Sequence, residues 1–179
     1  EDILHGVYLV RELTARTQDY IMSFGERLSA TIITEAFREA GLDSVYVDAR
    51  TVIRTDSRFG YARVNFETTD RLIREHYRQT SGVRVVTGFI ASADTGETTT
   101  LGRSGSDYTA AIFAGALKSE DLEIWTDVDG MMTADPRLVK KAFTVPSMSY
   151  EEAMELSHFG AKVIFPATMK PAMSYGIPI

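Results

Sequence analysis

The sequence contains no cysteine, which excludes disulfide bonds, thiolate metal sites and thiol catalysis. The lack of cysteine is also typical of a reducing compartment, so we expect a cytoplasmic protein. Basic residues are in the minority, with 19 Lys and Arg against 25 Asp and Glu, and the net charge of −6 argues against a general nucleic-acid binder. No stretch approaches the roughly 20 apolar residues that span a bilayer. We therefore expect neither nucleic acid nor a membrane as a partner.

The composition is that of a folded domain, because 44% of the 179 residues are hydrophobic and 25% are charged. The sequence has no internal repeat and no low-complexity linker, which predicts one compact unit. It begins with Glu1 rather than Met, and no basic segment followed by an apolar one marks a signal peptide. We expect the chain to be a piece of a longer protein.

Predicted helices and strands alternate along the chain. Apolar residues recur at helical spacing over residues 23–40, and Gly41 is a suitable stop. Further helices are predicted over 68–80, 106–118 and 150–159, and strands over 44–48, 83–90, 122–126, 162–165 and 176–179. This alternation predicts an α/β fold with a mainly parallel sheet, which places ligands at the carboxyl ends of its strands. Candidate site loops therefore follow Ile90 and Thr126 and surround Lys162.

Residues 98–109, TTTLGRSGSDYT, carry the strongest local signal. Gly102 and Gly105 bracket an Arg-Ser pair, and glycine lets a backbone approach a ligand closely. An Ala-rich helix follows, whose first N–H groups would favour an anion. The Arg103 guanidinium is a planar fork suited to a carboxylate or phosphate. The segment indicates an anion site, although spacing alone also allows a plain turn with Ser106 as helix cap.

Three further positions could carry ligand chemistry. Thr126 and Asp127 end a predicted strand, where they could bind sugar hydroxyls or an amine-bearing ring, or simply begin a turn. Lys162 lies at a predicted helix–strand junction, where it could reach a phosphate or remain an ordinary surface lysine. Glu26 follows a glycine at a predicted helix start, where it could hold an ammonium group or interact with the helix dipole.

Several familiar sites are excluded. The sequence lacks GxxxxGK[ST], so it has no P-loop. The GRSGS string lacks the final glycine of a nucleophile elbow, because Ser106 stands there. His5, His76 and His158 lie far apart without metal-ligand spacing, so we assign no side chain as a metal ligand.

Four strings in this order, FGERLSA, TTTLGRSGSDYTAA, EIWTDVDGMMTADPR and FGAKVIFPAT, resemble the catalytic domain of aspartokinases in the amino acid kinase family. The resemblance covers roughly residues 20–179. The string YLVRELTARTQDYIMSFGERLS, and Asp129 in TDVDG, are most similar to the aspartokinase half of bifunctional aspartokinase–homoserine dehydrogenases. This family implies a three-layer αβα sandwich with a mainly parallel sheet.

The resemblance implies ATP-dependent phosphorylation of L-aspartate to 4-phospho-L-aspartate, the first step toward lysine, threonine and methionine. It also implies Mg²⁺ carried with ATP and a homo-oligomer, a dimer or larger. The substrate's side-chain carboxylate is already ionised at neutral pH, so no strong base is needed. Catalysis would depend on positioning and on neutralising charge at the transferred group.

The resemblance also implies residue roles. Glu26 would hold the substrate ammonium and Arg103 its α-carboxylate, with Phe89 as a wall. Asp107 would order the cationic groups near the reacting phosphate. The remaining assignments are Ser104, Gly105 and Ser106 along the bound aspartate, Thr126 and Asp127 at the nucleoside, and Arg137 and Lys162 at the phosphates.

The sequence departs from the family pattern in three ways. The opening strand with its Lys-Phe-Gly-Gly phosphate loop is missing, so we expect residues 1–179 to be a partial catalytic domain that is inactive alone. The regulatory domains that follow in the family are also missing. Met132 stands where many members carry Tyr beside the nucleotide, and Ser104 replaces the glycine of GRGGSD.

Two alternative functions stay open. One is another amino acid kinase, of the glutamate 5-kinase or uridylate kinase type, although FGERLS together with GRSGSDYT favours aspartate. The other is a non-catalytic ligand-binding module, against which the presence of Glu26, Arg103, Asp107, Asp127 and Lys162 argues.

Overall fold

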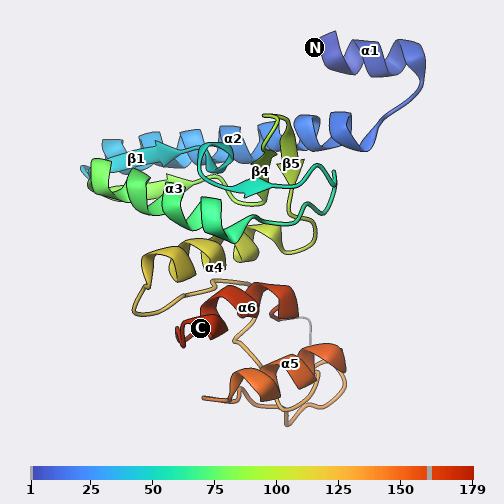
Figure 1. The fold of residues 1–179 in the computed structure, drawn as a ribbon. Coiled ribbons are helices and arrows are strands. Elements are labelled where there is room, and N and C mark those ends of the chain that lie inside the picture. Colours follow the sequence, from blue (N-terminus) through green and yellow to red (C-terminus); the bar gives the residue numbers. More distant parts are fainter. Residues whose placement is uncertain (1, 161–162) are drawn as a thin grey trace. The chain divides into compact units, whose positions relative to one another are not determined.

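The computed structural model describes residues 2–160 and 163–179, which divide into two compact units. The first unit ends at Ser106 and the second spans Asp107–Ile179, so the division falls within the first turn of one helix. The elements labelled in Figure 1 are α1 (Asp2–Val10), α2 (Ala15–Glu39), β1 (Ser44–Val47), η1 (Ala49–Thr51), β2 (Arg54–Thr55), α3 (Phe66–Gln79), β3 (Val83–Val86), β4 (Ile90–Ala93), β5 (Thr98–Thr100), α4 (Gly105–Leu117), α5 (Tyr150–His158) and α6 (Pro166–Ser174). Among the helices of the described residues, none is long and apolar enough to cross a bilayer.

The strands of the first unit form two small sheets. β1 pairs with β3 in parallel, with Ser44 opposite Val83. In the second sheet, β4 lies between β2, which runs parallel to it, and β5, which runs antiparallel. The predicted α/β class with parallel strand pairing is therefore confirmed.

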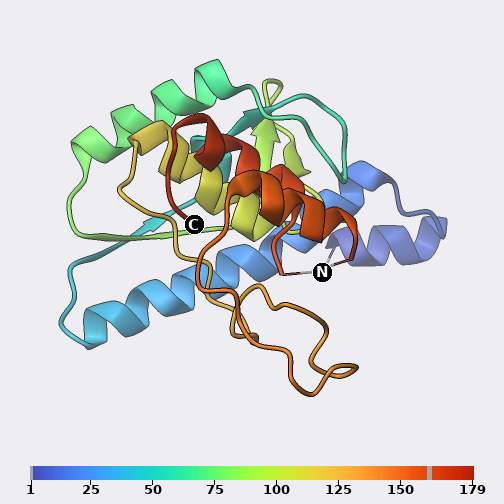
Figure 2. The same cartoon turned by 90° about the horizontal axis from the view of Figure 1, so that it is seen from below.

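Helix α2 is the long element that packs on both sheets, where it contacts β1, β3, β4 and β5. Thr14 caps its start by accepting a hydrogen bond from the Thr17 N–H (3.1 Å), so the helix begins earlier than predicted. Its end is where the sequence predicts it. Gly41 has a φ of 83°, and the Leu42 N–H reaches back to the Phe37 carbonyl (2.9 Å), which is a Schellman motif. Helix α1, at the end of the chain marked N in Figure 2, has no buried residue.

Four of the five strand predictions are wrong: those over 83–90, 122–126 and 176–179, and the described part of 162–165. The continuous strand over 83–90 is instead β3 and β4, separated at Phe89, which has a φ of 67° that no strand residue can adopt. Residues 122–126 form no strand, because their one backbone bond to residues 176–179, Leu122 N–H to the Pro178 carbonyl (2.9 Å), cannot be returned by a proline.

The end of the chain also differs from prediction. Residues 163 and 164 form bends, Phe165 is the N-cap of the next helix, and Lys162 lies outside the described residues. Pro166 does not stop a strand but begins α6, a position that suits proline because the first helical N–H has no partner to lose.

Each unit has apolar residues in its interior. The core of the first includes Val47, Ile53, Ile73 and Ile90, none more than 1% exposed. The second contains two small clusters, one of Ala111, Ala114, Leu122, Ala172 and Ile177, and one of Met131, Ala153 and Met169.

Candidate functional site

In the first unit, residues far apart in sequence meet around Gly88. A side-chain carbon placed on Gly88 would lie 2.9 Å from Ser106 Cβ and 3.7 Å from Glu26 Oε2. Gly88 lies between β3 and β4, Ser106 lies in the first turn of α4, and Glu26 lies on α2. The absence of a side chain at position 88 therefore lets the Glu26 carboxylate and the start of α4 approach each other.

Phe89 packs directly on the Gly-rich segment. A Cβ atom on Gly105 would lie 2.7 Å from Phe89 Cδ2 and 3.1 Å from Phe89 Cα, so only glycine fits there. The Leu101 N–H donates to the Phe89 carbonyl (2.9 Å), which ties the two segments together. The structure thus brings together Phe89, Gly105, Ser106 and Glu26, which the sequence analysis assigned to one amino-acid pocket.

Residues 102–105 form a tight turn that presents Arg103. The Gly105 N–H donates to the Gly102 carbonyl (3.1 Å), and Arg103 is exposed. Ser104 has a φ of 53°, a left-handed conformation in which a Cβ atom costs about 1–2 kcal/mol. This strain is a physical reason for the glycine that the family pattern has here. Ser106 lies inside α4, whose first residue is Gly105, so the alternative of Ser106 as helix cap is wrong.

The Glu26 carboxylate is half-buried and has no ion-pair or hydrogen-bond partner among the described residues. Burial raises the pKa of Glu26 above its ordinary value, because a charged carboxylate loses hydration there. A cationic ligand would relieve that cost. Glu26 thus has the properties of a binding group for an ammonium ion.

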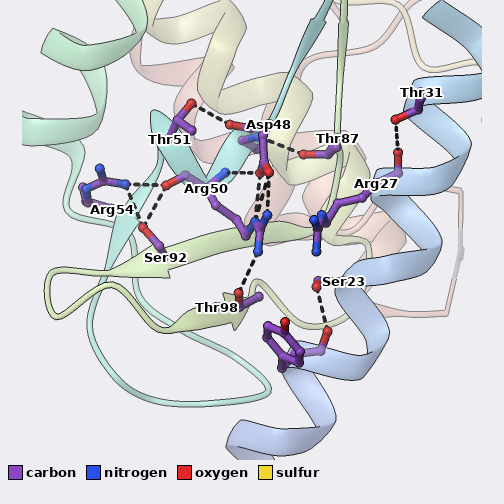
Figure 3. A network of polar contacts seen from close by, with 12 residues as sticks. Ser23, Arg27, Thr31, Asp48, Arg50, Thr51, Arg54, Thr87, Ser92 and Thr98 are labelled. Atoms are coloured by element: carbon purple, nitrogen blue, oxygen red, sulfur yellow. Dashed lines mark hydrogen bonds and ion pairs between the residues drawn. The ribbon is translucent and has the colours of Figure 1, made fainter. Parts of the chain in front are cut away.

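A polar network that the sequence analysis did not identify lies at the carboxyl end of β1 (Figure 3). Asp48 accepts hydrogen bonds from the Arg50 guanidinium, the shortest at 2.6 Å, and Arg50 also donates to Thr98 Oγ1 (3.1 Å). Burial opposes ionisation of Asp48, but the hydrogen bonds and charge of Arg50, with the charge of Arg27, hold the pKa of Asp48 below its ordinary value. The sequence signal that could have identified this network is the pair of opposite charges, Asp48 and Arg50, directly after a predicted buried strand. Asp48 and Arg50 compensate each other's charge, so this pair has a structural role at the end of β1.

In the second unit, Asp107 lies in the first turn of α4. Burial raises the pKa of this carboxyl group above its ordinary value, and no described residue pairs with it. Carboxylates are favourable at a helix N-terminus, which offsets part of this cost. Asp107 is therefore available to a cationic group.

A cavity of about 910 Å³ lies in the second unit. Its walls are mostly apolar and include Trp125, Val128, Met131, Tyr150 and Met169. Thr126 lines the cavity, and its hydroxyl lies 3.1 Å from Asp127 Oδ1. A cavity of this size with both apolar and polar groups at its wall could hold a small molecule.

The other sequence-predicted nucleotide residues lie near the following turn. Met132 is half-buried and forms an isolated antiparallel bridge with Thr144. Arg137 is exposed and bound to Asp135, with its Nη2 atom 2.8 Å from Asp135 Oδ2. This bonding lowers the pKa of Asp135 to about 2. The Arg137 side chain would have to leave Asp135 to reach a phosphate.

Lys162 lies outside the described residues, so the structure gives it no location. Within residues 2–160 and 163–179, no three His, Asp or Glu side chains are grouped as a metal site would require. The three histidines lie on α1, α3 and α5.

The chain is similar to known proteins over nearly all of its length. Residues 5–179 match the sequence pattern of the Amino acid kinase family. The chain is 42% identical to lysine-sensitive aspartokinase 3 of Escherichia coli, over 100% of this chain and 41% of that protein. It is 39% identical to the chloroplastic bifunctional aspartokinase/homoserine dehydrogenase 1 of Arabidopsis thaliana, over 99% of this chain and 20% of that protein.

The fold agrees as well. The crystal structure of E. coli aspartokinase III in complex with aspartate and ADP superposes with a TM-score of 0.88 at 37% identity, covering 98% of this chain and 41% of that one. The chain thus spans less than half the length of these relatives. With a family match over nearly all of its residues and the same fold as a member of known structure, the chain belongs to the amino acid kinase family.

Proposed function

We propose that the full-length protein containing this chain transfers the terminal phosphoryl group of ATP to the side-chain carboxylate of L-aspartate. Relatives that match the whole chain include aspartokinases, and a structural relative was crystallised with aspartate and ADP. The observation that carries the proposal is the meeting of Glu26 Oε2, Ser106 and Gly88 beside the Arg103 turn.

The amino-acid end of the substrate would bind in the first unit. Glu26 would accept the α-ammonium, because its carboxylate is half-buried and lacks a cationic partner among the described residues. Arg103 would bind the α-carboxylate, since its guanidinium is exposed and can make two parallel hydrogen bonds. Phe89, with Ser104, Gly105 and Ser106, would enclose the remaining surface.

In the reaction, a side-chain carboxylate oxygen of aspartate forms a bond to the terminal phosphorus of ATP. The bond between that phosphorus and the bridging oxygen breaks, and its electron pair leaves with ADP. No proton has to move, so the enzyme must mainly position two anions and neutralise their charge. Lys162 and Arg137 would supply positive charge at the phosphates, and Thr126 and Asp127 would contact the nucleoside, with Met132 nearby.

The residues present also fit a Mg²⁺ ion that arrives with ATP. Mg²⁺ in kinases usually binds phosphate oxygens and water, with only one or two protein carboxylates. Asp107 is such a carboxylate, and no described residue pairs with it. The ion would neutralise charge on the phosphates, and Asp107 would orient the cationic groups around it.

The test uses the full-length enzyme with ATP and three acceptors: L-aspartate, L-glutamate and uridylate. We expect ADP release and acyl-phosphate formation with aspartate, and at most trace activity with the other two. Turnover of glutamate or uridylate in preference to aspartate would assign the protein to another branch of the family. Absence of nucleotide and aspartate binding in calorimetry would instead support a non-catalytic module.

An arginine variant tests the assigned site directly. Arg103→Lys keeps the charge but loses the bidentate fork, so the KM for aspartate should rise about tenfold or more while the KM for ATP changes little. Arg78→Ala is the matched control, because Arg78 is an exposed arginine on α3. Equal effects of the two variants would contradict the role of Arg103. The expected homo-oligomer stays a prediction, which the mass of the full-length enzyme in solution would test.

A further inference from the structure

Asp19 is a buried carboxylate for which the proposed chemistry has no use. It lies in the second turn of α2, and only 2% of its surface is exposed. Asp is almost never fully buried unless its charge is compensated. Here the compensation comes from three neutral donors: Oδ2 accepts from the Gly60 N–H (2.8 Å) and the Thr100 N–H (3.0 Å), and Oδ1 accepts from the Thr100 hydroxyl (2.8 Å).

These donors lie at the base of the Arg103 turn. Thr100 is the last residue of β5, and its carbonyl accepts a hydrogen bond from the Ala62 N–H (2.9 Å). The N–H, hydroxyl and carbonyl of Thr100 are therefore all hydrogen-bonded, to Asp19 or to Ala62. The turn that presents Arg103 begins just after this fixed residue, so its starting point cannot shift without breaking buried hydrogen bonds.

Asp19 also lies on the face of α2 that carries Glu26. The two are seven positions apart, which is close to two helical turns and therefore one side of the helix. Ser23 and Ala30, on the same side, are 0% and 5% exposed, so this face of the helix is packed inward. Asp19 thus connects the helix bearing Glu26 to the strand that leads to Arg103.

We propose that Asp19 is a positioning residue that sets the placement of the Arg103 turn relative to Glu26. The inference rests on the proposed function, in which these two side chains bind the two charged groups on the α-carbon of aspartate. Both Asp19 oxygens already accept hydrogen bonds from the protein, so Asp19 acts through the turn and not on the substrate. Misplacing a binding group by an ångström can cost a large factor in rate or affinity.

The test compares variants of the full-length enzyme in steady-state kinetics. Asp19→Ala removes all three hydrogen bonds and should raise the KM for aspartate about tenfold or more, with a smaller change in kcat and in the KM for ATP. Asp19→Asn should restore a nearly wild-type KM. Its amide oxygen can accept from both N–H groups, and its NH₂ group can donate to the Thr100 hydroxyl, which can reverse and accept.

Thr100→Val keeps the inference testable if Asp19→Ala does not fold, because it removes one hydrogen bond and keeps a β-branched side chain in the strand. It should raise the KM for aspartate about threefold. The matched control is Thr55→Val, which breaks another buried hydroxyl pair, with Thr99 (2.7 Å), in the same sheet. It should lower stability without changing that KM.

The outcomes separate the two proposals. A wild-type enzyme that does not phosphorylate aspartate defeats the proposed function. An active wild type in which Thr100→Val and Thr55→Val have the same KM for aspartate defeats only the role of Asp19. An Asp19→Asn enzyme as impaired as a folded Asp19→Ala enzyme would also overturn it, because geometry would then not explain the effect.

Discussion

Two carboxylates on one face of α2 have opposite surroundings. Asp19 accepts three hydrogen bonds from the protein, whereas Glu26 has no partner among the described residues and burial raises its pKa. A carboxylate that is buried without a partner lowers the stability of the fold, and such groups are typical of binding sites. The contrast supports a structural role for Asp19 and the proposed ligand-binding role of Glu26.

Replacing Glu26 by glutamine should therefore weaken aspartate binding and stabilise the protein. The KM for aspartate should rise by about 10- to 100-fold, because a charged hydrogen-bond partner of the ammonium is lost. The melting temperature at neutral pH should increase, because Gln has no charge to desolvate. Kinetics and thermal unfolding of the same variant check both parts.

The effect of Glu26→Gln on stability should depend on pH. Because the pKa of Glu26 is higher in the folded protein than in the unfolded chain, the folded state binds the proton more tightly. The stability of the fold therefore falls as pH rises from the pKa of the unfolded chain through the pKa of the folded protein. The stability advantage of Glu26→Gln should accordingly shrink as pH falls below the raised pKa. An advantage that stays constant or grows with acidification would contradict this account.

Gly105→Ala should damage both folding and substrate binding. The new Cβ would lie 2.7 Å from Phe89 Cδ2 and 3.1 Å from Phe89 Cα, so the backbone has to move, at a cost of about 1–3 kcal/mol in the free energy of unfolding. Gly25→Ala is the control, because nothing lies within 4 Å of that position. Alanine inside α2 should stabilise by about 0.5–1 kcal/mol. Urea denaturation of both variants would reveal whether the signs differ.

At the scale of one element, α5 depends on its first residues. Ser149 accepts a hydrogen bond from the Glu152 N–H (3.2 Å), and the Glu152 carboxylate accepts one from the Ser149 N–H (2.7 Å), which is a complete capping box. Ser149→Ala should lower the free energy of unfolding of the second unit by about 1 kcal/mol. Ser81→Ala, at an exposed serine, should have no measurable effect. A null result for Ser149→Ala in chemical denaturation would mean that α5 is held by packing alone.

The helices could be predicted from the sequence to within a few residues, because helical periodicity and caps are local signals. The predicted spans 68–80, 106–118 and 150–159 correspond to α3, α4 and α5. The first turns of α2 were missed because they are largely polar in sequence. Their one buried acid, Asp19, resembles a surface residue until its donors are known.

Strands were less predictable, because a strand forms only where a partner exists. Residues 122–126 are apolar but have only a single bond to Pro178. The segment 83–90 has continuous β-propensity, and only Gly88 indicated that the strand is interrupted there. The interruption places Phe89 against Gly105. For the candidate site, the motifs indicated Glu26, Phe89, Gly105 and Ser106, whose binding roles stay predictions and which the structure brings together. They could not identify Asp19, whose donors are 41 and 81 positions away in sequence.

Across the whole molecule, regular structure is unevenly distributed. The strands from residue 44 to 55 and from 90 to 100 are mostly buried, whereas the described residues 118–149 form no helix or strand beyond isolated bridges. Hydrogen exchange followed by mass spectrometry should show slow exchange in the first two segments and much faster exchange in the third. Equal protection of all three would contradict the division of stability described here.

Trp125 is the single tryptophan of the chain, and 88% of its surface is exposed although it lines the cavity of the second unit. Its indole N–H donates to Glu123 Oε2 (2.9 Å), and its exposed ring is in contact with water. Indole emission shifts to the blue and changes intensity when water is excluded from the ring. The chain therefore carries an intrinsic fluorophore at the wall of this cavity, by which occupancy of the cavity can be followed in solution without a label.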